Sequence, residues 1–265
     1  MKIVVCVKQV PEVTNVQVNP ATGTLIREGV SSILNPFCEY ALDHAVRLKQ
    51  TNEDVHITAV SMGPPQAKDA LLRCLELGAD EGILLTDRRF AGADTWATAY
   101  SLSEAIRTLV PDFDLILVGK QAIDGDTAQV GPEIAEILGI PQITYGTDVA
   151  IYPEKKRVRV RQEVEQGYAV IEAALPALVT CSKGELVRRV PSFMDMINAR
   201  KKSISLVTAD DLLLPEAELG LKGSFTQVVK VFPPREHKNN LILQNLDAEE
   251  AARQIFAFLK KQRFI

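Results

Sequence analysis

The chain has 265 residues, of which 46% are hydrophobic and 24% are charged, and its formal net charge at pH 7 is −4. This composition is typical of a globular protein that can bury a large core. The small negative charge excludes a basic field that would hold nucleic acid or an anionic membrane, and no apolar run approaches the roughly 20 residues of a membrane-spanning helix.

The N-terminal segment is read as structure and not as a targeting signal. Residues 3–7 form an unbroken apolar run, which predicts a buried central strand of a parallel sheet. The run is too short for a signal peptide. The four cysteines are widely spaced and no Cys-x-x-Cys occurs. We therefore expect reduced thiols in a cytoplasmic protein, with no disulfide and no metal site.

A long connection separates this strand from the first helix. The helix is predicted to begin at Asn35–Pro36, with asparagine as the cap and proline in the first turn. Between them, Val16 and Val18 alternate with polar residues, a turn follows at residues 19–23, and Leu25 and Ile26 come next. The pattern predicts an ordered hairpin flap beside the carboxyl end of the first strand.

Strands and helices then alternate regularly. We expect strands at residues 55–60, 81–85 and 113–118, with helices at 65–77 and 95–109. This rhythm predicts an α/β fold, a doubly wound and mostly parallel sheet of the Rossmann-like, adenine-nucleotide-binding kind, with strand order 3-2-1-4-5. Ligands of such folds bind outside the carboxyl ends of the strands, where the winding reverses between the first and fourth strands.

The segment that follows the fourth strand, residues 119–132, joins a buried strand to a helix through a glycine-bearing turn. Free N–H groups and the positive end of a helix dipole make such a turn an anion site. Asp126 and Gln129 have capping-box spacing, whereas Pro132 suits a first helical position, so the helix begins between Asp126 and Pro132. An ordinary βα loop has the same spacing. Three other segments end at this crevice: residues 6–8, the Asn35 cap and residues 61–64.

The chemistry-bearing motifs of common enzymes are absent from the sequence. It has no nucleophile elbow, no Walker loop and no G-x-G-x-x-G fingerprint. We interpret Asp124 and Asp126 as helix caps in preference to a catalytic pair, and His44 as a surface or hydrogen-bonded histidine in preference to a base. An anion-binding turn without an acid–base or nucleophile set indicates a bound cofactor that carries the chemistry.

Beyond Pro141 the pattern changes to alternating antiparallel strands, at residues 145–152, 157–162 and 167–173, before a buried strand at 176–181. The alternating arginines of residues 157–161 predict a solvated edge and not a nucleic-acid patch.

From Ser182 the core signal fades. We expect one more strand at residues 225–232 and an amphipathic helix at 247–263. Residues 1–190 are therefore predicted to form the nucleotide- or FAD-binding domain, with antiparallel additions to its sheet. Residues 191–265 are predicted to form an extended arm that packs on a partner chain; the alternative is a helix that folds back on its own sheet.

Four motifs stand in order along the chain: VKQVP at residues 7–11, NPFCE at 35–39, SMGP at 61–64 and GKQAIDGDTAQVGP at 119–132. Together they resemble the beta subunit of electron-transfer flavoproteins, essentially from end to end. The resemblance implies a heterodimer with an alpha subunit that carries a mobile flavin. The crevice of the beta chain then holds AMP or, in electron-bifurcating members, a second FAD.

Carried over by motif, the implied nucleotide contacts are Cys6, Asn35, Pro36, Phe37, Cys38, Met62, Gly119, Lys120, Gln121, Ala122, Ile123, Asp124, Gly125, Asp126, Thr127, Ala128, Gln129 and Val130. The segment before residues 199–202 resembles the partner-recognition loop of the family. Its implied partner-binding residues are Phe193, Met194, Asp195, Met196 and Ile197.

Two of the motifs resemble the bifurcating branch, namely residues 8–11 and 124–132. The AMP-holding branch tends to carry a bulkier acidic residue at the position of Gly125, and glycine would leave space for a pyrophosphate and a flavin. Residues 35–39 resemble both branches equally.

The bifurcating branch implies that NADH gives a hydride to FAD near residues 12–30. One electron then passes to ferredoxin and the other, through the alpha-subunit FAD, to an acyl- or enoyl-CoA dehydrogenase or reductase. The alternative is a carrier that holds structural AMP and passes electrons between an acyl-CoA dehydrogenase and a quinone reductase. Neither reading involves nucleic acid or membrane insertion.

Overall fold

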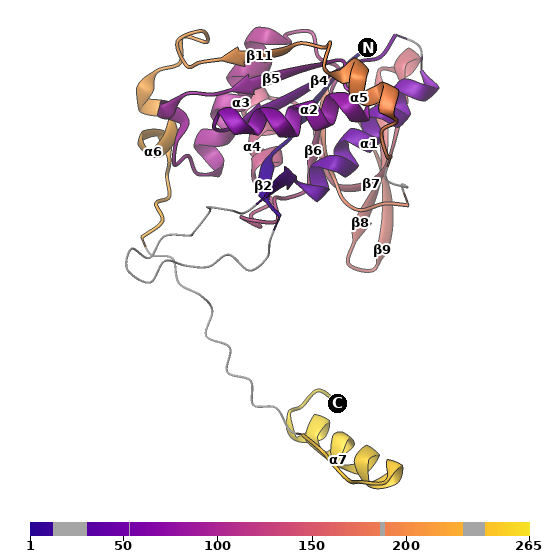
Figure 1. Cartoon of the computed structure of the whole chain (residues 1–265). Coiled ribbons are helices and arrows are strands. Elements are labelled where there is room, and N and C mark those ends of the chain that lie inside the picture. Colours follow the sequence, from indigo (N-terminus) through magenta and orange to yellow (C-terminus); the bar gives the residue numbers. More distant parts are fainter. Residues whose placement is uncertain (13–30, 53, 186–188, 230–241) are drawn as a thin grey trace.

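The computed structural model describes residues 1–12, 31–52, 54–185, 189–229 and 242–265 (Figure 1). The hairpin flap expected around residues 16–26 lies outside the described residues. A nine-stranded sheet has the order β11-β5-β4-β1-β6-β10-β7-β8-β9. Its central parallel strands are β5 (Glu81–Leu85), β4 (His56–Met62), β1 (Lys2–Cys6), β6 (Leu115–Gly119) and β10 (Ala177–Cys181). The 3-2-1-4 part of the doubly wound order is confirmed by β5, β4, β1 and β6. The last position differs from the prediction, because β10 lies between β6 and β7, although β7 comes first in the chain.

The two faces of the sheet are covered by different helices. Helices α1 (Pro36–Thr51) and α2 (Lys68–Leu77) pack on one face, and α3 (Thr95–Leu109) and α4 (Val130–Leu138) pack on the other. Strand β1 shows why, because its side chains alternate between the faces. Ile3 and Val5 contribute to the core beneath α1 and α2, whereas Val4 and Cys6 contribute to the core beneath α3 and α4. A strand buried on both faces must be continuously apolar, as residues 3–7 are.

Additions flank the parallel strands at both edges. Strand β7 (Gln142–Tyr152) pairs parallel to β10 and antiparallel to β8 (Arg157–Val164), and β9 (Gly167–Ala174) forms the outer edge. The arginine-bearing strand is therefore interior and not an edge as predicted. Its solvated face is confirmed, because Val158 and Val160 are fully buried while Arg157 and Arg159 are exposed.

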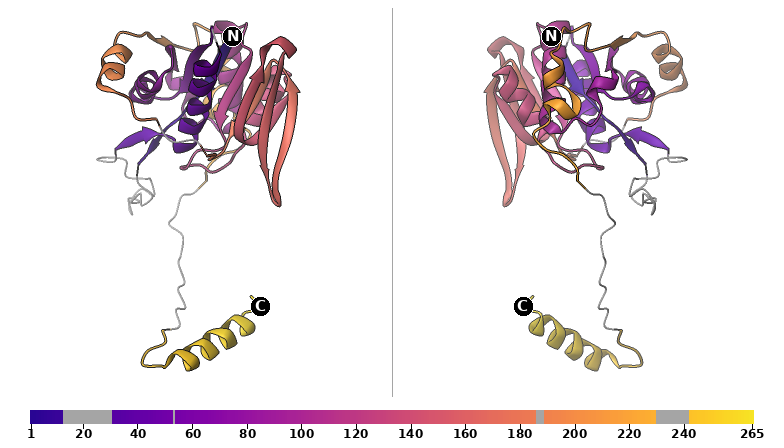
Figure 2. Two further views of the ribbon diagram at one scale, coloured as in Figure 1. Left: turned by 90° about the vertical axis from the view of Figure 1, so that its right-hand side faces the viewer. Right: turned by 90° about the vertical axis from the view of Figure 1, so that its left-hand side faces the viewer.

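A separate two-stranded antiparallel sheet pairs β2 (Gln9–Pro11) with β3 (Ser32–Leu34) beside the carboxyl end of β1. Short 3-10 turns occupy Pro65–Ala67 (η1), Arg88–Phe90 (η2), Pro153–Lys155 (η3) and Glu216–Glu218 (η4). Figure 2 shows β2 and β3 on one side of the body and the β8–β9 hairpin on the other.

The segment beyond residue 190 contributes to the body. After α5 (Phe193–Ala199), strand β11 (Ile204–Val207) pairs parallel to β5, and residues such as Leu212 and Leu219 are buried in the core beneath α3. The sheet therefore extends past residue 190, where we had placed the domain boundary. A short helix, α6 (Gly220–Gly223), follows.

Of the last two elements that the sequence predicts, one is wrong in its described part and the other is confirmed. Residues 225–229 form no strand, so the strand expected at 225–232 is wrong for its described part. The predicted C-terminal helix is confirmed as α7 (Ala248–Lys261), capped by Asp247. Helix α7 has no buried residue. Among the described residues, no helix combines the length and the apolar character needed to cross a membrane.

Candidate functional site

The crevice predicted at the reversal of strand order lies between the carboxyl ends of β1 and β6. Cys6 at the end of β1 pairs with Val118 near the end of β6. The chain leaves these neighbouring strands toward opposite faces, since α1 covers one face and α4 the other. In folds of this class, opposite departures leave a crevice at the carboxyl edge of the sheet.

Asn35 connects the two sides of this crevice. It occupies the cap position of α1, but its side chain makes no capping hydrogen bond, which corrects the predicted cap. The side chain is 1% exposed, and its amide nitrogen donates to the carbonyl oxygen of Gln121 at 2.8 Å and to the Cys38 sulfur at 3.2 Å. Its amide oxygen accepts from the backbone N–H of Ile123 at 3.2 Å. Asn35 therefore fastens the turn after β6 to the start of α1.

Gly119 permits this close approach. A Cβ atom at Gly119 would lie 2.7 Å from the carbonyl carbon of Phe37 and 2.8 Å from the nitrogen of Cys38. Only a hydrogen atom fits at that distance, so the end of β6 contacts the backbone of the first turn of α1. The structure thus brings together Phe37, Cys38 and Gly119, which the motif resemblance implied as nucleotide contacts.

The turn itself is held by polar contacts that do not cap the next helix. Asp124 forms a bidentate ion pair with Lys8, at 2.8 and 2.9 Å. Asp126 has a φ of +56° and accepts from the side-chain amide of Gln121. Helix α4 begins at Val130 with Gln129 at the cap position and no side-chain cap. The predicted capping box and the predicted cap roles of both aspartates are therefore wrong.

The start of α4 leaves backbone donors available. Among the described residues, the N–H groups of residues 127–131 find no acceptor. Residues 123–127 are exposed, and Ala128 has a φ of +57°. Unpaired N–H groups at the positive end of a helix dipole favour an anion. These are the features by which a turn of this kind can hold a phosphate.

Gly125 differs from the other glycines of this segment. A Cβ atom at Gly125 would meet no atom within 4 Å, whereas one at Gly131 would lie 2.7 Å from the Thr180 methyl group. The packing of the chain therefore demands glycine at residue 131 and not at residue 125. The space around Gly125 is open.

The cysteines of the crevice are neutral thiols. All four cysteines of the chain are free and buried, as the expectation of reduced thiols requires. Burial, and secondarily the neighbouring Cys38, raises the pKa of Cys6 to about 12. Burial likewise raises the pKa of Cys38. Neither thiol is activated as a nucleophile. Met62 lies half-buried at the carboxyl end of β4.

Three further residues are placed differently from the sequence interpretation. His44 is 1% exposed and its ring nitrogens have no hydrogen-bond partner, so it is neither a surface nor a hydrogen-bonded histidine. Burial lowers the pKa of His44 to about 4, which makes it a neutral packing residue. Lys8 was missed as a site residue, although it directly follows the first strand. Tyr145 of β7, which the sequence did not single out, has its ring centroid 5.5 Å from the Lys120 ammonium.

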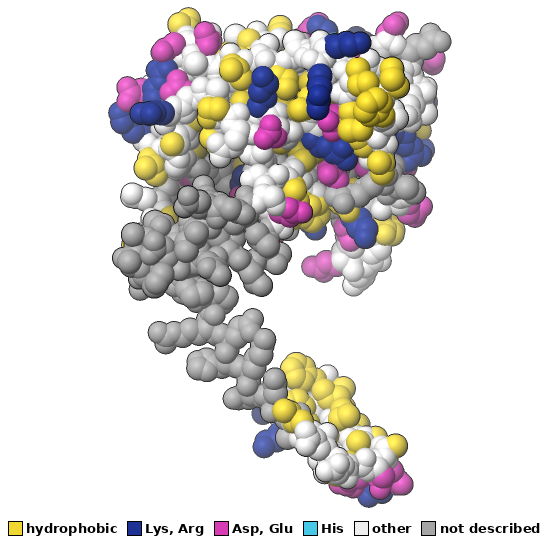
Figure 3. All heavy atoms as spheres, in the orientation of Figure 1, with side chains coloured by type: hydrophobic (Ala, Val, Ile, Leu, Met, Phe, Trp, Pro, Cys, Tyr) yellow, Lys and Arg dark blue, Asp and Glu magenta, His cyan; other side chains and the backbone are white. Residues whose placement is uncertain are grey.

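The partner-binding candidates form the first turns of α5. Ser192 and Asp195 make a capping box, and the hydrogen bonds from Ser192 hold the pKa of Asp195 below its ordinary value. Phe193 is 73% exposed and Met194 59% exposed, with Ile197 also exposed and Met196 half-buried. Figure 3 shows hydrophobic side chains gathered over α5. Helix α5 therefore exposes an apolar surface, and Asp195 is occupied in capping the N-terminus of this helix.

Comparisons with known proteins agree with the motifs. A family model described as "Electron transfer flavoprotein domain" matches residues 22–212. The chain is 47% identical over 257 residues to "Electron transfer flavoprotein subunit beta" of Megasphaera elsdenii, covering 95% of this chain and 94% of that one. It is 43% identical over 265 residues to "Caffeyl-CoA reductase-Etf complex subunit CarD" of Acetobacterium woodii, covering 100% of both. It is 39% identical over 268 residues to "Acryloyl-CoA reductase electron transfer subunit gamma" of Anaerotignum propionicum, covering 98% and 99%.

Proposed function

Because the chain belongs to the electron-transfer flavoprotein family, among its beta subunits, we propose that its β1–β6 crevice binds FAD and serves NADH-dependent electron bifurcation. The family membership confirms the resemblance found in the motifs. The choice of FAD over AMP, and the roles of NADH and ferredoxin, are the proposal.

The open space at Gly125 is the observation that carries the proposal. It lies beside the unpaired N–H groups of residues 127–131, which suit a phosphate or a pyrophosphate. The chain's own packing does not require glycine at residue 125. Glycine at this position is therefore explained by a ligand larger than AMP, one that extends past the phosphate-holding amides.

When bound, FAD would supply two-electron acceptance from NADH and one-electron donation to separate acceptors. The chain's own residues position it. Asn35 holds the turn against α1, and Lys8 holds Asp124 in an ion pair. That pairing offsets a carboxylate charge that would otherwise repel the phosphates of the ligand.

We propose that two apolar surfaces contact the alpha subunit. The first is α5, with Phe193, Met194 and Ile197 exposed; the second is α7, with Ile255 and Phe256 exposed. Exposed apolar side chains on a helix face are typical of protein–protein contacts. Two relatives are named for caffeyl-CoA and acryloyl-CoA reductases, which supports a CoA-ester reductase or dehydrogenase as one electron acceptor. Ferredoxin as the other acceptor is supported by the branch resemblance of the motifs.

A carrier that holds AMP is the second candidate. The N–H groups of residues 127–131 would bind the single phosphate of AMP as well as they bind a pyrophosphate. In that case the beta chain would stabilise the heterodimer, and only the alpha-subunit flavin would accept electrons.

The experiment uses the complex of this chain with its alpha subunit. We expect FAD in the beta crevice in addition to the alpha-subunit flavin, and anaerobic NADH should bleach it. Gly125→Glu should lose the NADH-reducible flavin and retain AMP, because the new side chain occupies the open space. Gly125→Ala is the matched control and should keep FAD. A wild-type complex that contains AMP, lacks the additional FAD and is not reduced by NADH would overturn the proposal.

A further inference from the structure

We propose that Tyr145 is a positioning residue of the nucleotide site, whose ring holds the Lys120 ammonium beside Phe37 so that this cation meets the ligand's phosphates. The inference rests on the proposed function only in requiring that the crevice bind an adenine nucleotide. It adds a residue of β7, outside every motif that carries the family resemblance.

The geometry joins three elements. The Lys120 ammonium lies 5.3 Å from the ring centroid of Phe37 and 5.5 Å from that of Tyr145. Both distances are within the roughly 6 Å at which a cation is attracted to a ring face. Phe37 belongs to the first turn of α1, and Lys120 directly follows β6, where its N–H donates to the carbonyl oxygen of Cys181 at 2.9 Å. Tyr145 therefore reaches the crevice through Lys120.

The Lys120 ammonium has no carboxylate partner among the residues that the structure describes. Lys8, on the other side of the turn, is neutralised by Asp124. An ammonium held between two rings, on the same connection between β6 and α4 as the free N–H groups, adds positive charge where backbone donors already favour an anion. The chemistry fits a phosphate ester.

Tyr145 adopts a backbone conformation that an aromatic residue rarely takes. Its φ is +55°, in the left-handed region, and its N–H donates to the hydroxyl of Thr180 at 3.0 Å. The next residue is a glycine, yet the positive φ falls on the tyrosine. Gly146 is required for packing, since a Cβ there would lie 2.9 Å from Val160 and Val179. The register of β7 against β10 shifts at this point, and a bulge of this kind redirects a side chain.

The test measures nucleotide affinity in the complex with the alpha subunit, after its bound nucleotide has been removed. The probes are ADP and adenosine, titrated calorimetrically at two salt concentrations. Tyr145→Leu should weaken ADP about five- to tenfold, leave adenosine nearly unchanged and flatten the salt dependence. Lys120→Met should do the same, and the double variant should be no weaker than Lys120→Met alone. Tyr145→Phe keeps the ring and should retain affinity.

Two controls separate positioning from folding. Tyr145→Gly should bind ADP as weakly as Tyr145→Leu while its thermal midpoint stays equal or rises, because glycine accepts the positive φ without strain. A tyrosine with a structural role alone would lower the midpoint. Tyr168→Leu removes a ring of β9 that lies 4.8 Å from the guanidinium of Arg161 on β8, and it should leave ADP affinity unchanged.

The outcomes of this experiment and of the proposed function are distinguishable. Wild-type affinity for ADP in both Tyr145→Leu and Lys120→Met would overturn the inference and leave the proposed function intact. Absence of adenine-nucleotide binding in the wild-type complex would overturn the proposed function and the inference with it.

Discussion

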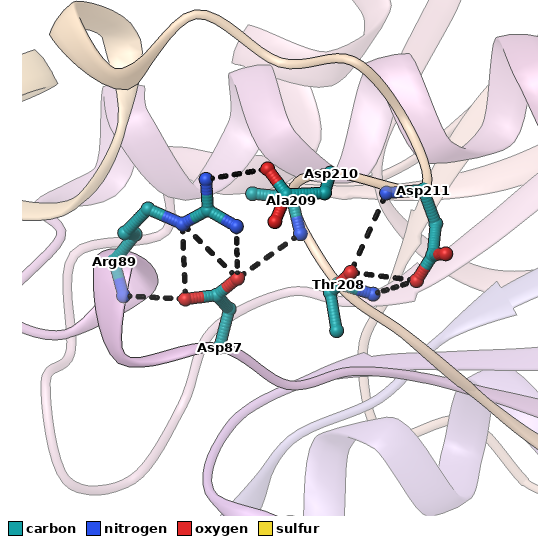
Figure 4. Close-up of polar contacts among 6 residues, drawn as sticks. All are labelled: Asp87, Arg89, Thr208, Ala209, Asp210 and Asp211. Carbon is teal, nitrogen blue, oxygen red and sulfur yellow. Dashed lines mark hydrogen bonds and ion pairs between the residues drawn. The ribbon is translucent and has the colours of Figure 1, made fainter.

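Two polar clusters at the carboxyl edge of the sheet differ in how their groups are paired. In the first, which follows β5 and β11, the Arg89 guanidinium donates to both Asp87 oxygens, at 2.6 to 3.1 Å, and to Asp210 at 2.8 Å (Figure 4). Asp87 also accepts from the N–H of Ala209 at 3.3 Å. Each of its charged groups has a partner within the chain, and the cluster fastens the segment after β11 to the body.

The crevice is the second cluster, and its groups are not matched. The N–H groups of residues 127–131 and the Lys120 ammonium lack acceptors among the described residues. Most of these N–H groups lie at exposed or half-buried residues, so water meets them in the free chain and an anion can take the place of that water. The contrast teaches that a gathering of charges at an edge does not by itself mark a binding site, because the Arg89 cluster gathers charged groups as well. In this molecule the candidate binding site is distinguished by hydrogen-bond donors that have no acceptor among the described residues.

The largest effect we expect separates packing from binding within the crevice. Gly119→Ala should destabilise the fold by about 3 kcal/mol, because the new methyl group meets the backbone of Phe37 and Cys38, which cannot move away easily. Gly125→Ala should change stability by less than about 0.5 kcal/mol, since nothing lies within 4 Å. Urea unfolding of both variants checks this. Equal stabilities would show that the turn after β6 is not held against α1.

The next prediction concerns the Arg89 cluster. Asp87→Asn should destabilise the fold by about 2 kcal/mol at neutral pH, because it removes the negative charge and one of the two oxygens that accept from the guanidinium of Arg89. Hydrogen bonds from Arg89 hold the pKa of Asp87 well below its ordinary value. A lowered folded pKa contributes stability above the unfolded pKa, about 3.9, which is lost as the pH falls through the folded value.

The measurement is the free energy of unfolding of wild type and Asp87→Asn between pH 7 and pH 2. The difference should be constant down to about pH 4 and shrink below it. Nucleotide affinity of the complex should be unaffected throughout. A difference that persists unchanged at pH 2 would show that Asp87 acts by packing and not by its charge.

Sequence periodicity predicted those helices and strands whose own residues show a clear pattern of apolar positions. Strand β5 and helix α3 have the predicted bounds, because Glu81–Leu85 is continuously apolar at its core and Thr95–Leu109 has one apolar face. Strand β11 was not predicted, because its own segment carries little periodic signal. It is short and only Val207 is buried, so its pairing with β5 leaves little trace in its composition.

The site was predictable as a place and less so as a set of contacts. The reversal of strand order located the crevice before any side chain was placed. Asn35 shows why the contacts could not be predicted. An asparagine before a proline indicates the start of a helix, but the sequence does not tell whether its side chain caps that helix or, as here, donates to the carbonyl oxygen of Gln121. Tyr145 is a second example, because a positive φ would be expected at the neighbouring glycine and not at the tyrosine. Long-range pairing decides both cases.

The smallest effect concerns the one ion pair within the crevice, Lys8–Asp124. Its side chains are 49% and 33% exposed, so Lys8→Met should cost at most about 0.5 kcal/mol of stability. Its effect on binding should be larger than its effect on folding, because an unpaired Asp124 repels phosphate. ADP affinity of the complex should fall about threefold, and the double variant Lys8→Met, Asp124→Asn should restore it. If the double variant binds no better than Lys8→Met, the ammonium of Lys8 contacts the nucleotide directly, and the crevice has two phosphate-binding lysines where the contrast with the Arg89 cluster assigns it one.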